Sequence, residues 1–197
     1  MPKIQTLRGM NDIGPTEAKE WSQVELTLQS ILESYGYEEI RFPIVEKTEL
    51  FTRSNEAADI VTKEMYSFED KSGESISLRP EGTAGCVRAA IDNDLLRTDK
   101  PRLWYSGPMF RYERPQKGRS RQFHQFSAEV FGLNTPAVDV ELITASASFW
   151  KAFGIYEDVT LEINNLGDDR ARSNYVKELV GFLNGKLDDI DDDSRRK

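Results

Sequence analysis

The chain has 197 residues, a hydrophobic fraction of 38% and a net charge of −8, which are typical of one folded domain rather than of a disordered chain. Net acidity disfavours broad binding to nucleic acid, which depends on many contacts between cations and phosphates. No stretch reaches the ~18 apolar residues of a membrane span, and the N-terminus lacks a signal-peptide core, so we expect a cytoplasmic protein that does not bind membranes.

Cysteine and histidine are too scarce for several kinds of site. Cys86 is the only cysteine, so the chain cannot form an internal disulfide, as expected in a reducing cytosol. We interpret Cys86 as a small packed residue of a helix rather than as a catalytic thiol. His124 is the only histidine, which excludes a multi-histidine metal site and a nucleophile–histidine pair within this chain. We predict no metal-binding side chains.

The first predicted helix begins near Pro15, with Thr16 as its N-terminal cap, and ends at Gly36. Residues 38–46 then alternate like a strand until Pro43 interrupts them. Proline donates no hydrogen bond to a neighbouring strand, so this strand lies at a sheet edge or stops there. An interrupted edge after a long helix is either a dimer surface or an ordinary exposed edge.

A β-hairpin is predicted over residues 64–80, followed by a helix through Ile91. Glu81 and Thr83 lie at the exit of the second strand, where their side chains can reach a ligand on the face of the sheet. The alternative is that Pro80 and Glu81 are simply favourable first-turn residues of the helix.

The most informative segment runs from Phe110 to Phe131. Two runs that can form strands flank a turn at residues 115–118. The tip concentrates five cations beside one acid, Glu113; the cations are Arg111, Arg114, Lys117, Arg119 and Arg121. Guanidinium groups bind phosphate oxygens with two parallel hydrogen bonds and stay charged, so the tip suits phosphates. The alternative is a solvated hairpin with a basic tip.

The faces of this hairpin follow from strand alternation, because every second side chain of a strand shares a face. Arg111 and Glu113 would point one way from the first arm. One face of the second arm would carry Phe123, Gln125, Ser127 and Glu129, and the opposite face Phe126, Ala128 and Val130. The second set suits a core, whereas the first is a poor core and indicates the floor of a ligand site.

Three further elements are predicted towards the C-terminus: a helix from Pro136, a short strand over residues 159–163 and a last helix that carries Tyr175 and Leu179. The charge-dense residues 187–197 are either a solvated tail or a cut within a larger protein. Consecutive strands with separate helices predict an α+β fold, a mainly antiparallel sheet flanked by helices.

Four segments resemble one family in order and spacing. They are LRGMND, the helix leading into YGYEEIRFPIVEKTELF, LRPEGTAGCVRA, and GPMFRYERPQKGRSRQFHQFSAEVFG. They are similar to the N-terminal part of the catalytic domain of bacterial histidyl-tRNA synthetases, which are class II aminoacyl-tRNA synthetases. The helix and strand of about residues 16–45 look like motif 1, the dimer interface of that class, and the hairpin of residues 111–129 looks like motif 2.

The resemblance covers essentially all of residues 1–197, whereas the enzymes of that family are much longer. It implies that the sequence is a fragment of the catalytic domain that ends near the start of the family's insertion domain. Motif 3 and the anticodon-binding domain would lie beyond Lys197. Activity of this piece by itself is therefore not expected.

The implied activity is that of a histidine–tRNA ligase. ATP and L-histidine form histidyl-adenylate, and tRNA(His) then receives the histidyl group. By resemblance, Arg111 is the catalytic residue and grips the α-phosphate, Glu113 accepts from the adenine amino group, and Phe123 stacks on the adenine. Arg119 or Arg121 would contact the outer phosphates or the tRNA acceptor end. Mg²⁺ would bind mainly through ATP.

The resemblance also implies a histidine site. Glu81 and Thr83 would hold the α-amino group, with Gln125 nearby, and Arg111 would also bind the histidine. Glu129 would contact the amino group or the imidazole.

Two rival interpretations remain. Some bacteria carry a synthetase-like subunit that senses histidine and regulates ATP phosphoribosyltransferase without aminoacylating tRNA. That paralogue need not keep the ATP-binding hairpin, so the complete hairpin favours the synthetase. A simple nucleotide- or RNA-binding module explains the cations but gives the glutamates and the glutamine of the sheet face no purpose.

Overall fold

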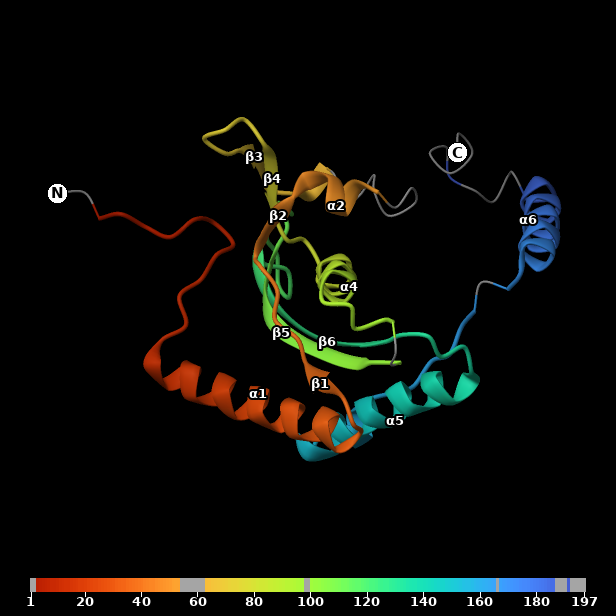
Figure 1. Cartoon of the computed structure of the whole chain (residues 1–197). Coiled ribbons are helices and arrows are strands. Elements are labelled where there is room, and N and C mark those ends of the chain that lie inside the picture. Colours follow the sequence, from red (N-terminus) through yellow and green to blue (C-terminus); the bar gives the residue numbers. More distant parts are fainter. Residues whose placement is uncertain (1–2, 54–62, 98–99, 166, 187–190, 192–197) are drawn as a thin grey trace. The chain divides into compact units, whose positions relative to one another are not determined.

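The computed structural model describes residues 3–53, 63–97, 100–165, 167–186 and 191 (Figure 1). The chain divides into two compact units, Met1–Glu157 and Asp158–Lys197. Among the described residues of the first unit are two three-stranded sheets, with the strand orders β1-β5-β6 and β2-β4-β3. Only the β1–β5 pair is parallel in these two sheets, so the predicted α+β fold with mainly antiparallel strands is confirmed.

The strands are β1 (Glu38–Glu39), β2 (Val45–Lys47), β3 (Ser67–Glu69), β4 (Ser75–Leu78), β5 (Arg102–Phe110) and β6 (Gln122–Val130). The helices of the first unit are α1 (Pro15–Ser34), α2 (Thr48–Thr52), α4 (Thr83–Asp92) and α5 (Pro136–Ala152). A short 3-10 helix, η1 (Tyr156–Asp158), follows, and α6 (Asp169–Asn184) belongs to the second unit. The predicted hairpin of residues 64–80 and the helices from Pro136 and through Tyr175 are thus confirmed.

The start of α1 differs from the prediction. Its N-cap is Gly14, which makes no side-chain hydrogen bond to the helix, and Thr16 lies inside the first turn. Pro15 explains the difference, because proline suits the first helical position, where its fixed φ matches the helix and its missing N–H needs no acceptor.

The end of α1 directs the chain into the first sheet. Gly36 has a φ of +80°, which glycine adopts without steric cost. The Tyr37 N–H donates to Leu32 O at 3.1 Å and the Gly36 N–H donates to Glu33 O at 2.9 Å, which is the Schellman pattern of a helix C-terminus. The reversal buries Tyr37 and starts β1.

The strand expected over residues 38–46 is broken into β1 and β2, which belong to different sheets. Ile40 donates to Trp104 O at 2.9 Å as the chain leaves β5, and Ile44 O accepts from the next sheet. Pro43 lies between these points, and because it has no N–H it suits the gap between the two ladders.

Strands β5 and β6 pair over nine residues each, from Arg102↔Val130 to Phe110↔Gln122. One face of this pair packs against α1 and α5, below the sheet in Figure 1. Its core contains Phe126, Ala128 and Val130, as predicted from strand alternation, around Leu32, Tyr37, Trp104 and Ala145. The Trp104 and Phe126 rings stack at 5.1 Å. Helix α4 covers the other face, where Cys86 and Ala90 contact Leu103, Tyr105 and Met109.

The strand predicted over residues 159–163 is wrong, because this segment of the second unit has no regular structure. Leu161 and Ile163 are 62% and 77% exposed. A strand needs the backbone groups of a neighbour, and the described residues provide no partner strand for this segment.

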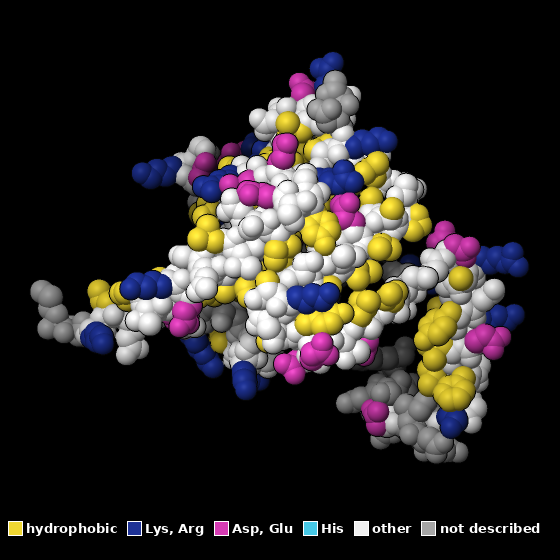
Figure 2. Space-filling model, turned by 90° about the horizontal axis from the view of Figure 1, so that it is seen from below, with side chains coloured by type: hydrophobic (Ala, Val, Ile, Leu, Met, Phe, Trp, Pro, Cys, Tyr) yellow, Lys and Arg dark blue, Asp and Glu magenta, His cyan; other side chains and the backbone are white. Residues whose placement is uncertain are grey.

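Helix α6 forms as predicted, and the Asp168 carboxylate caps it by accepting from the Ala171 N–H at 2.7 Å. Its apolar side chains, which include Tyr175, Leu179 and Phe182, are exposed along one side (Figure 2). None of the helices in the described part of the chain is long and apolar enough to cross a membrane.

The packing of α1 against the sheet gives a direct test of the core. Leu32 is 2% exposed, whereas Leu26 of the same helix is 65% exposed. We expect Leu32→Ala to lower the free energy of unfolding by about 2–5 kcal/mol, because it leaves a cavity, and Leu26→Ala to lower it by less than about 1 kcal/mol. Urea denaturation followed by tryptophan fluorescence measures both; equal losses would contradict this description of the core.

Candidate functional site

The two sheets meet at Arg79, the residue that follows β4. Its backbone N–H donates to Ile44 O at 2.9 Å, and its carbonyl accepts from the Phe110 N–H at 3.0 Å. Its side chain donates from Nε to Pro108 O at 2.9 Å and from Nη1 to Phe42 O at 3.2 Å. One residue therefore fastens the segment before β2 to the end of β5.

Arg79 is 5% exposed, and its guanidinium also lies 5.1 Å from the centre of the Phe42 ring. Burial lowers the pKa of Arg79, and attraction to Glu46 offsets only part of this effect. A Cβ atom at Gly107 would overlap the guanidinium, so the approach of Arg79 to β5 requires glycine at that position. The sequence alone does not reveal this role of Arg79, because its hydrogen-bond partners lie far away in the chain.

Glu81 makes the helix-start contact that the sequence left open as an alternative. Its carboxylate accepts from the N–H groups of Thr83 at 2.5 Å and Ala84 at 3.0 Å, at the N-terminus of α4. A carboxylate offers about four acceptor positions, so these two bonds leave capacity for a ligand.

Thr83 links this helix start to the sheet. Its hydroxyl donates to Glu129 Oε1 at 2.7 Å, and the Tyr105 hydroxyl donates to the same oxygen at 3.3 Å. Burial raises the pKa of Tyr105 to about 12, so this phenol keeps its proton as a donor at neutral pH. A Cβ atom at Gly82 would overlap the Tyr105 ring, which makes glycine necessary there. Strand alternation placed Glu129 on this face but did not reveal Tyr105 as its partner.

Gln125 carries an unpaired acceptor on the same face of the sheet. It lies opposite Gly107 in the β5–β6 ladder. Its Oε1 atom is buried and has no hydrogen-bond partner within the described part of the chain. Buried polar atoms are rarely left unpaired in folded proteins, so a ligand donor or a water is expected at this oxygen.

Arg111 and Glu113 lie beyond the end of β5, which stops at Phe110, so the strand expected to carry them is wrong. Their side chains nevertheless lie on the same side, as expected, with Glu113 Oε1 4.0 Å from Arg111 Nη1. Side-chain contacts, rather than a strand, fix the direction of Arg111. Arg111 Nε donates to Pro80 O at 2.8 Å, and its guanidinium lies 5.2 Å from the centre of the Phe123 ring. Arg111 is therefore fixed to the segment that carries Glu81.

The Glu113 carboxylate lies close to two arginines of the hairpin. It lies 4.0 Å from Arg111 Nη1 and 3.4 Å from Arg119 Nη1. The Arg121 guanidinium lies 3.9 Å from the centre of the Tyr112 ring, and its Nε donates to Glu113 O at 3.2 Å. Arg119 is exposed at the tip, whereas Arg121 is half-buried at its base.

Most of the predicted site residues thus fall into two connected groups. Hydrogen bonds join Glu81, Thr83 and Glu129. In the second group Arg111 contacts Glu113 and Phe123, and Glu113 also pairs with Arg119. The bond from Arg111 to Pro80 O connects the groups. The arrangement can hold an ammonium group near carboxylates at one end and an anion near guanidinium groups at the other.

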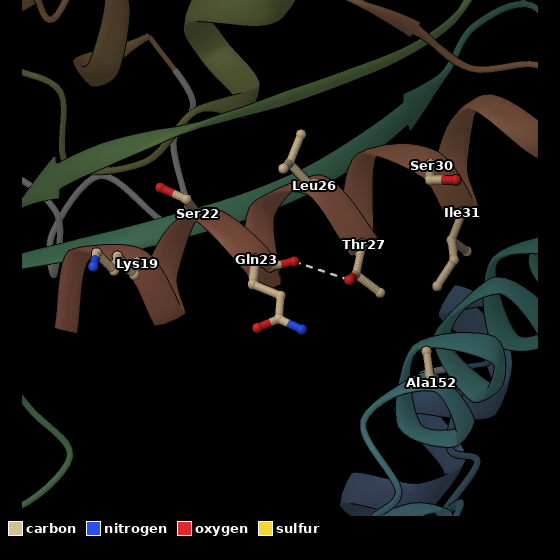
Figure 3. Close-up of a pocket in the computed structure, with 8 residues that line it drawn as sticks. All are labelled: Lys19, Ser22, Gln23, Leu26, Thr27, Ser30, Ile31 and Ala152. Atoms are coloured by element: carbon tan, nitrogen blue, oxygen red, sulfur yellow. Dashed lines mark hydrogen bonds between the residues drawn. The ribbon is translucent and has the colours of Figure 1, made fainter. Parts of the chain in front are cut away.

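A separate hollow of about 550 Å³ lies between α1 and the end of α5. Figure 3 shows its wall, which includes Leu26 and Ile31 of α1 and Ala152 of α5. The Thr27 hydroxyl in this wall donates to Gln23 O at 2.9 Å. Apart from Ala152, its lining residues belong to the region of residues 16–45, for which the resemblance implies a dimer contact.

Comparison with known proteins agrees with this geometry. A family model described as histidyl-tRNA synthetase matches residues 9–167. The apo histidyl-tRNA synthetase of S. aureus is similar, with a TM-score of 0.74 and 36% identity over 97% of this chain and 45% of that chain. A histidine–tRNA ligase subunit from Alicyclobacillus acidocaldarius has a TM-score of 0.62 and 25% identity, over 76% of this chain and 43% of its own.

A protein from Bacillus halodurans described as an ATP phosphoribosyltransferase regulatory subunit/histidyl-tRNA synthetase has a TM-score of 0.67. Its identity is 24%, over 76% of this chain and 38% of that chain, so it shows a likeness of fold alone.

The fold is that of a class II aminoacyl-tRNA synthetase catalytic domain. The chain belongs to the histidyl-tRNA synthetase family, because the family model matches well over half of its residues. It spans less than half the length of the S. aureus enzyme.

The alkylation rate of Cys86 tests the packing of the core beside this site. It is fully buried, and burial raises the pKa of its thiol to about 12. Because the thiolate is the reactive form, we expect iodoacetamide to alkylate the folded chain at least about 100-fold more slowly than the urea-unfolded chain at pH 8. A comparable rate in the folded chain would show that Cys86 is accessible and its thiol acidic.

Proposed function

We propose that the chain forms the N-terminal part of the catalytic domain of a cytoplasmic histidine–tRNA ligase. The whole enzyme would activate histidine with ATP to form histidyl-adenylate, and would then transfer the histidyl group to tRNA(His). The main support is the continuous set of contacts through residues 79–83, which connects Arg111 to the group of Glu81, Thr83 and Glu129. Membership of the histidyl-tRNA synthetase family is the second support.

In the first step the histidine carboxylate attacks the α-phosphorus of ATP, the bond to the bridging oxygen breaks, and pyrophosphate leaves. The attacking carboxylate is already ionised, so the step needs no general base. It needs alignment of the reactants and stabilisation of the charge that develops around phosphorus.

Arg111 would stabilise that charge. Its Nε–H is held by Pro80 O, which leaves the terminal N–H groups of the guanidinium for the α-phosphate and the substrate carboxylate. Because the donor is fixed before the substrate arrives, little reorganisation is needed in the transition state. Lysine cannot reproduce this fork of parallel donors.

The adenine would lie near Phe123 and Glu113, with the ring on the phenyl group and the amino group donating to the carboxylate. Arg119 and Arg121 would serve the outer phosphates or the tRNA acceptor end. Mg²⁺ would be held largely by phosphate and water oxygens. No group of three or more metal-binding side chains occurs among the described residues.

The histidine amino group would be held by Glu81 and Thr83, next to Gln125. An ammonium group satisfies a carboxylate and an unpaired amide oxygen at once, and the Gln125 Oε1 atom is such an oxygen. Glu129 would take a second donor, from the amino group or from the imidazole. A site built from buried hydrogen-bonding groups rejects analogues that lack the matching donors.

The region of about residues 16–45 would form a two-fold contact in a homodimer. Exposed apolar side chains of α1, including Leu26, lie beside the hollow shown in Figure 3. In an isologous contact each patch meets its own copy, so a single surface suffices.

Separate calorimetric titrations with ATP–Mg²⁺ and with histidine test the proposed function, on the 197-residue chain and on the full-length enzyme that we propose contains it. We expect the full-length enzyme to bind both ligands and the chain alone to bind each more weakly. Histidine binding without ATP binding by the full-length enzyme would contradict the proposal and favour a histidine-sensing regulatory subunit.

The role of Arg111 gives a kinetic prediction for the full-length enzyme. Because its contact strengthens as charge develops, Arg111→Ala and Arg111→Lys should lower kcat of histidine-dependent pyrophosphate exchange by at least about 100-fold. The exposed Arg114 of the same tip is the matched control, and Arg114→Ala should change kcat by less than about threefold. A change confined to the KM for ATP would contradict the role of Arg111.

A further inference from the structure

The N-terminal segment contacts the base of the basic hairpin through one backbone carbonyl. Leu7 to Met10 form a turn in which the Met10 N–H donates to Leu7 O at 2.9 Å and Gly9 has a φ of +84°. The Gly9 carbonyl accepts from the N–H of Arg121 at 2.7 Å and from the N–H of Gln122 at 3.2 Å. These two amides mark the point where the tip of the hairpin enters β6.

No side chain fits at Gly9. A Cβ atom there would lie 2.9 Å from Pro115 Cγ, 3.0 Å from Arg121 Cγ and 3.2 Å from Arg121 N. The positive φ adds a second restriction, because residues with a Cβ adopt it only with strain. The backbone of the turn therefore lies in direct contact with Pro115 and Arg121, one on each side of the tip.

The contact continues from Arg121 to Arg111. The Arg121 carbonyl accepts from the Arg111 N–H at 2.9 Å, so the residue whose amide Gly9 holds also fixes the backbone of Arg111. The Arg121 side chain covers the Tyr112 ring and donates to Glu113 O. Tyr112 is anchored in turn by donating its N–H to Glu64 O at 2.6 Å.

Burial of apolar surface does not explain why the segment lies there. Ile4 is 96% exposed and Leu7 is 66% exposed, and only Met10 of the turn is partly buried, so the apolar side chains of the segment contribute little to the core. Two backbone hydrogen bonds and the close approach of Gly9 attach the turn to the hairpin directly. The contact is suited to setting the position of the tip.

We propose that the turn of Leu7–Met10 is a positioning element for Arg111, and that Gly9 acts through the Arg121 backbone. The inference rests on the proposed function, in which Arg111 grips the α-phosphate. A displaced Arg121 would move the Arg111 backbone while leaving the bond from Glu81 to the start of α4 in place. Loss of the turn should therefore weaken binding of ATP more than binding of histidine.

The variant Gly9→Ala tests the proposal, with two glycine controls from the same chain. Gly14 has a φ of −73° and no atom within 4 Å of an added Cβ, so Gly14→Ala controls for the substitution itself. Gly73 has a φ of +82° and equally open surroundings, so Gly73→Ala controls for backbone strain without a clash.

Two quantities are measured: ATP–Mg²⁺ affinity of the full-length enzyme, and hydrogen exchange of the amides of Arg111, Arg121 and Gln122. For Gly9→Ala we expect an affinity loss of at least about tenfold and exchange at least about tenfold faster at these amides. The loss of histidine affinity should be smaller. Both controls should stay within about threefold of the unmodified protein in ATP affinity. The proposal would be overturned if Gly9→Ala leaves ATP affinity and exchange unchanged, or if Gly73→Ala lowers ATP affinity and speeds exchange as much as Gly9→Ala does.

Deleting the N-terminal segment removes the Gly9 carbonyl, which accepts from Arg121 and Gln122, without adding a side chain that would clash. Removing residues 2–11 should reproduce the effects of Gly9→Ala, whereas removing residues 2–5, which leaves the turn intact, should not. Equal results for the two deletions would overturn the role of the turn. If the unmodified full-length enzyme binds no ATP, the proposed function fails, but exchange at Arg121 and Gln122 still decides whether Gly9 holds the tip.

Discussion

The site depends on a buried arginine whose hydrogen bonds go to carbonyl groups rather than to carboxylates. Arg79 spans the junction of the two sheets, with its backbone bonded to Ile44 and Phe110 and its side chain bonded to Pro108 O and Phe42 O. Removing the guanidinium would leave buried carbonyl acceptors without a partner, at a cost of about 1–3 kcal/mol for each. Pro43 and Gly107 fit the same constraint, because one lets the chain pass from sheet to sheet and the other leaves room for the guanidinium.

The chemistry of the site extends from this junction. Residues 79–83 leave β4 in a fixed direction, so Pro80 O can hold Arg111 while the Glu81 carboxylate holds the start of α4. Thr83 then reaches across to Glu129. A segment of five residues thus connects the cation proposed to meet phosphate with the carboxylates proposed to meet an amino group. Donors and acceptors held in place before a ligand binds are what an adenylation reaction requires, since it depends on alignment and on stabilised charge rather than on proton transfer.

Local patterns in the sequence predicted most helices and strands correctly, but they could not predict contacts between residues that lie far apart in the chain. Helical spacing and Pro136 located α5, and period-two alternation correctly assigned Phe126, Ala128 and Val130 to the core. The same alternation failed at residues 159–163, which have no partner strand among the described residues. Strand β5 ends before Arg111, although the side chains of Arg111 and Glu113 lie on the same side as expected. Arg79, Tyr105 and Gly9 were missed because their roles come from carbonyls, a carboxylate and amides that lie far away in sequence. The sequence pattern located the candidate residues, their individual roles came from resemblance to a family, and the structure adds the contacts that connect them.

The central claim is that the two groups of residues joined by the 79–83 segment bind the two halves of one intermediate. The most direct test is a crystal structure of the full-length enzyme with a non-hydrolysable sulfamoyl analogue of histidyl-adenylate. The account predicts the sulfamoyl group, which replaces the phosphate, at Arg111, the histidine amino group between Glu81 and Thr83, and the adenine against Phe123. An analogue bound with its adenine away from the β5–β6 hairpin, or with its amino group remote from Glu81, would contradict the account.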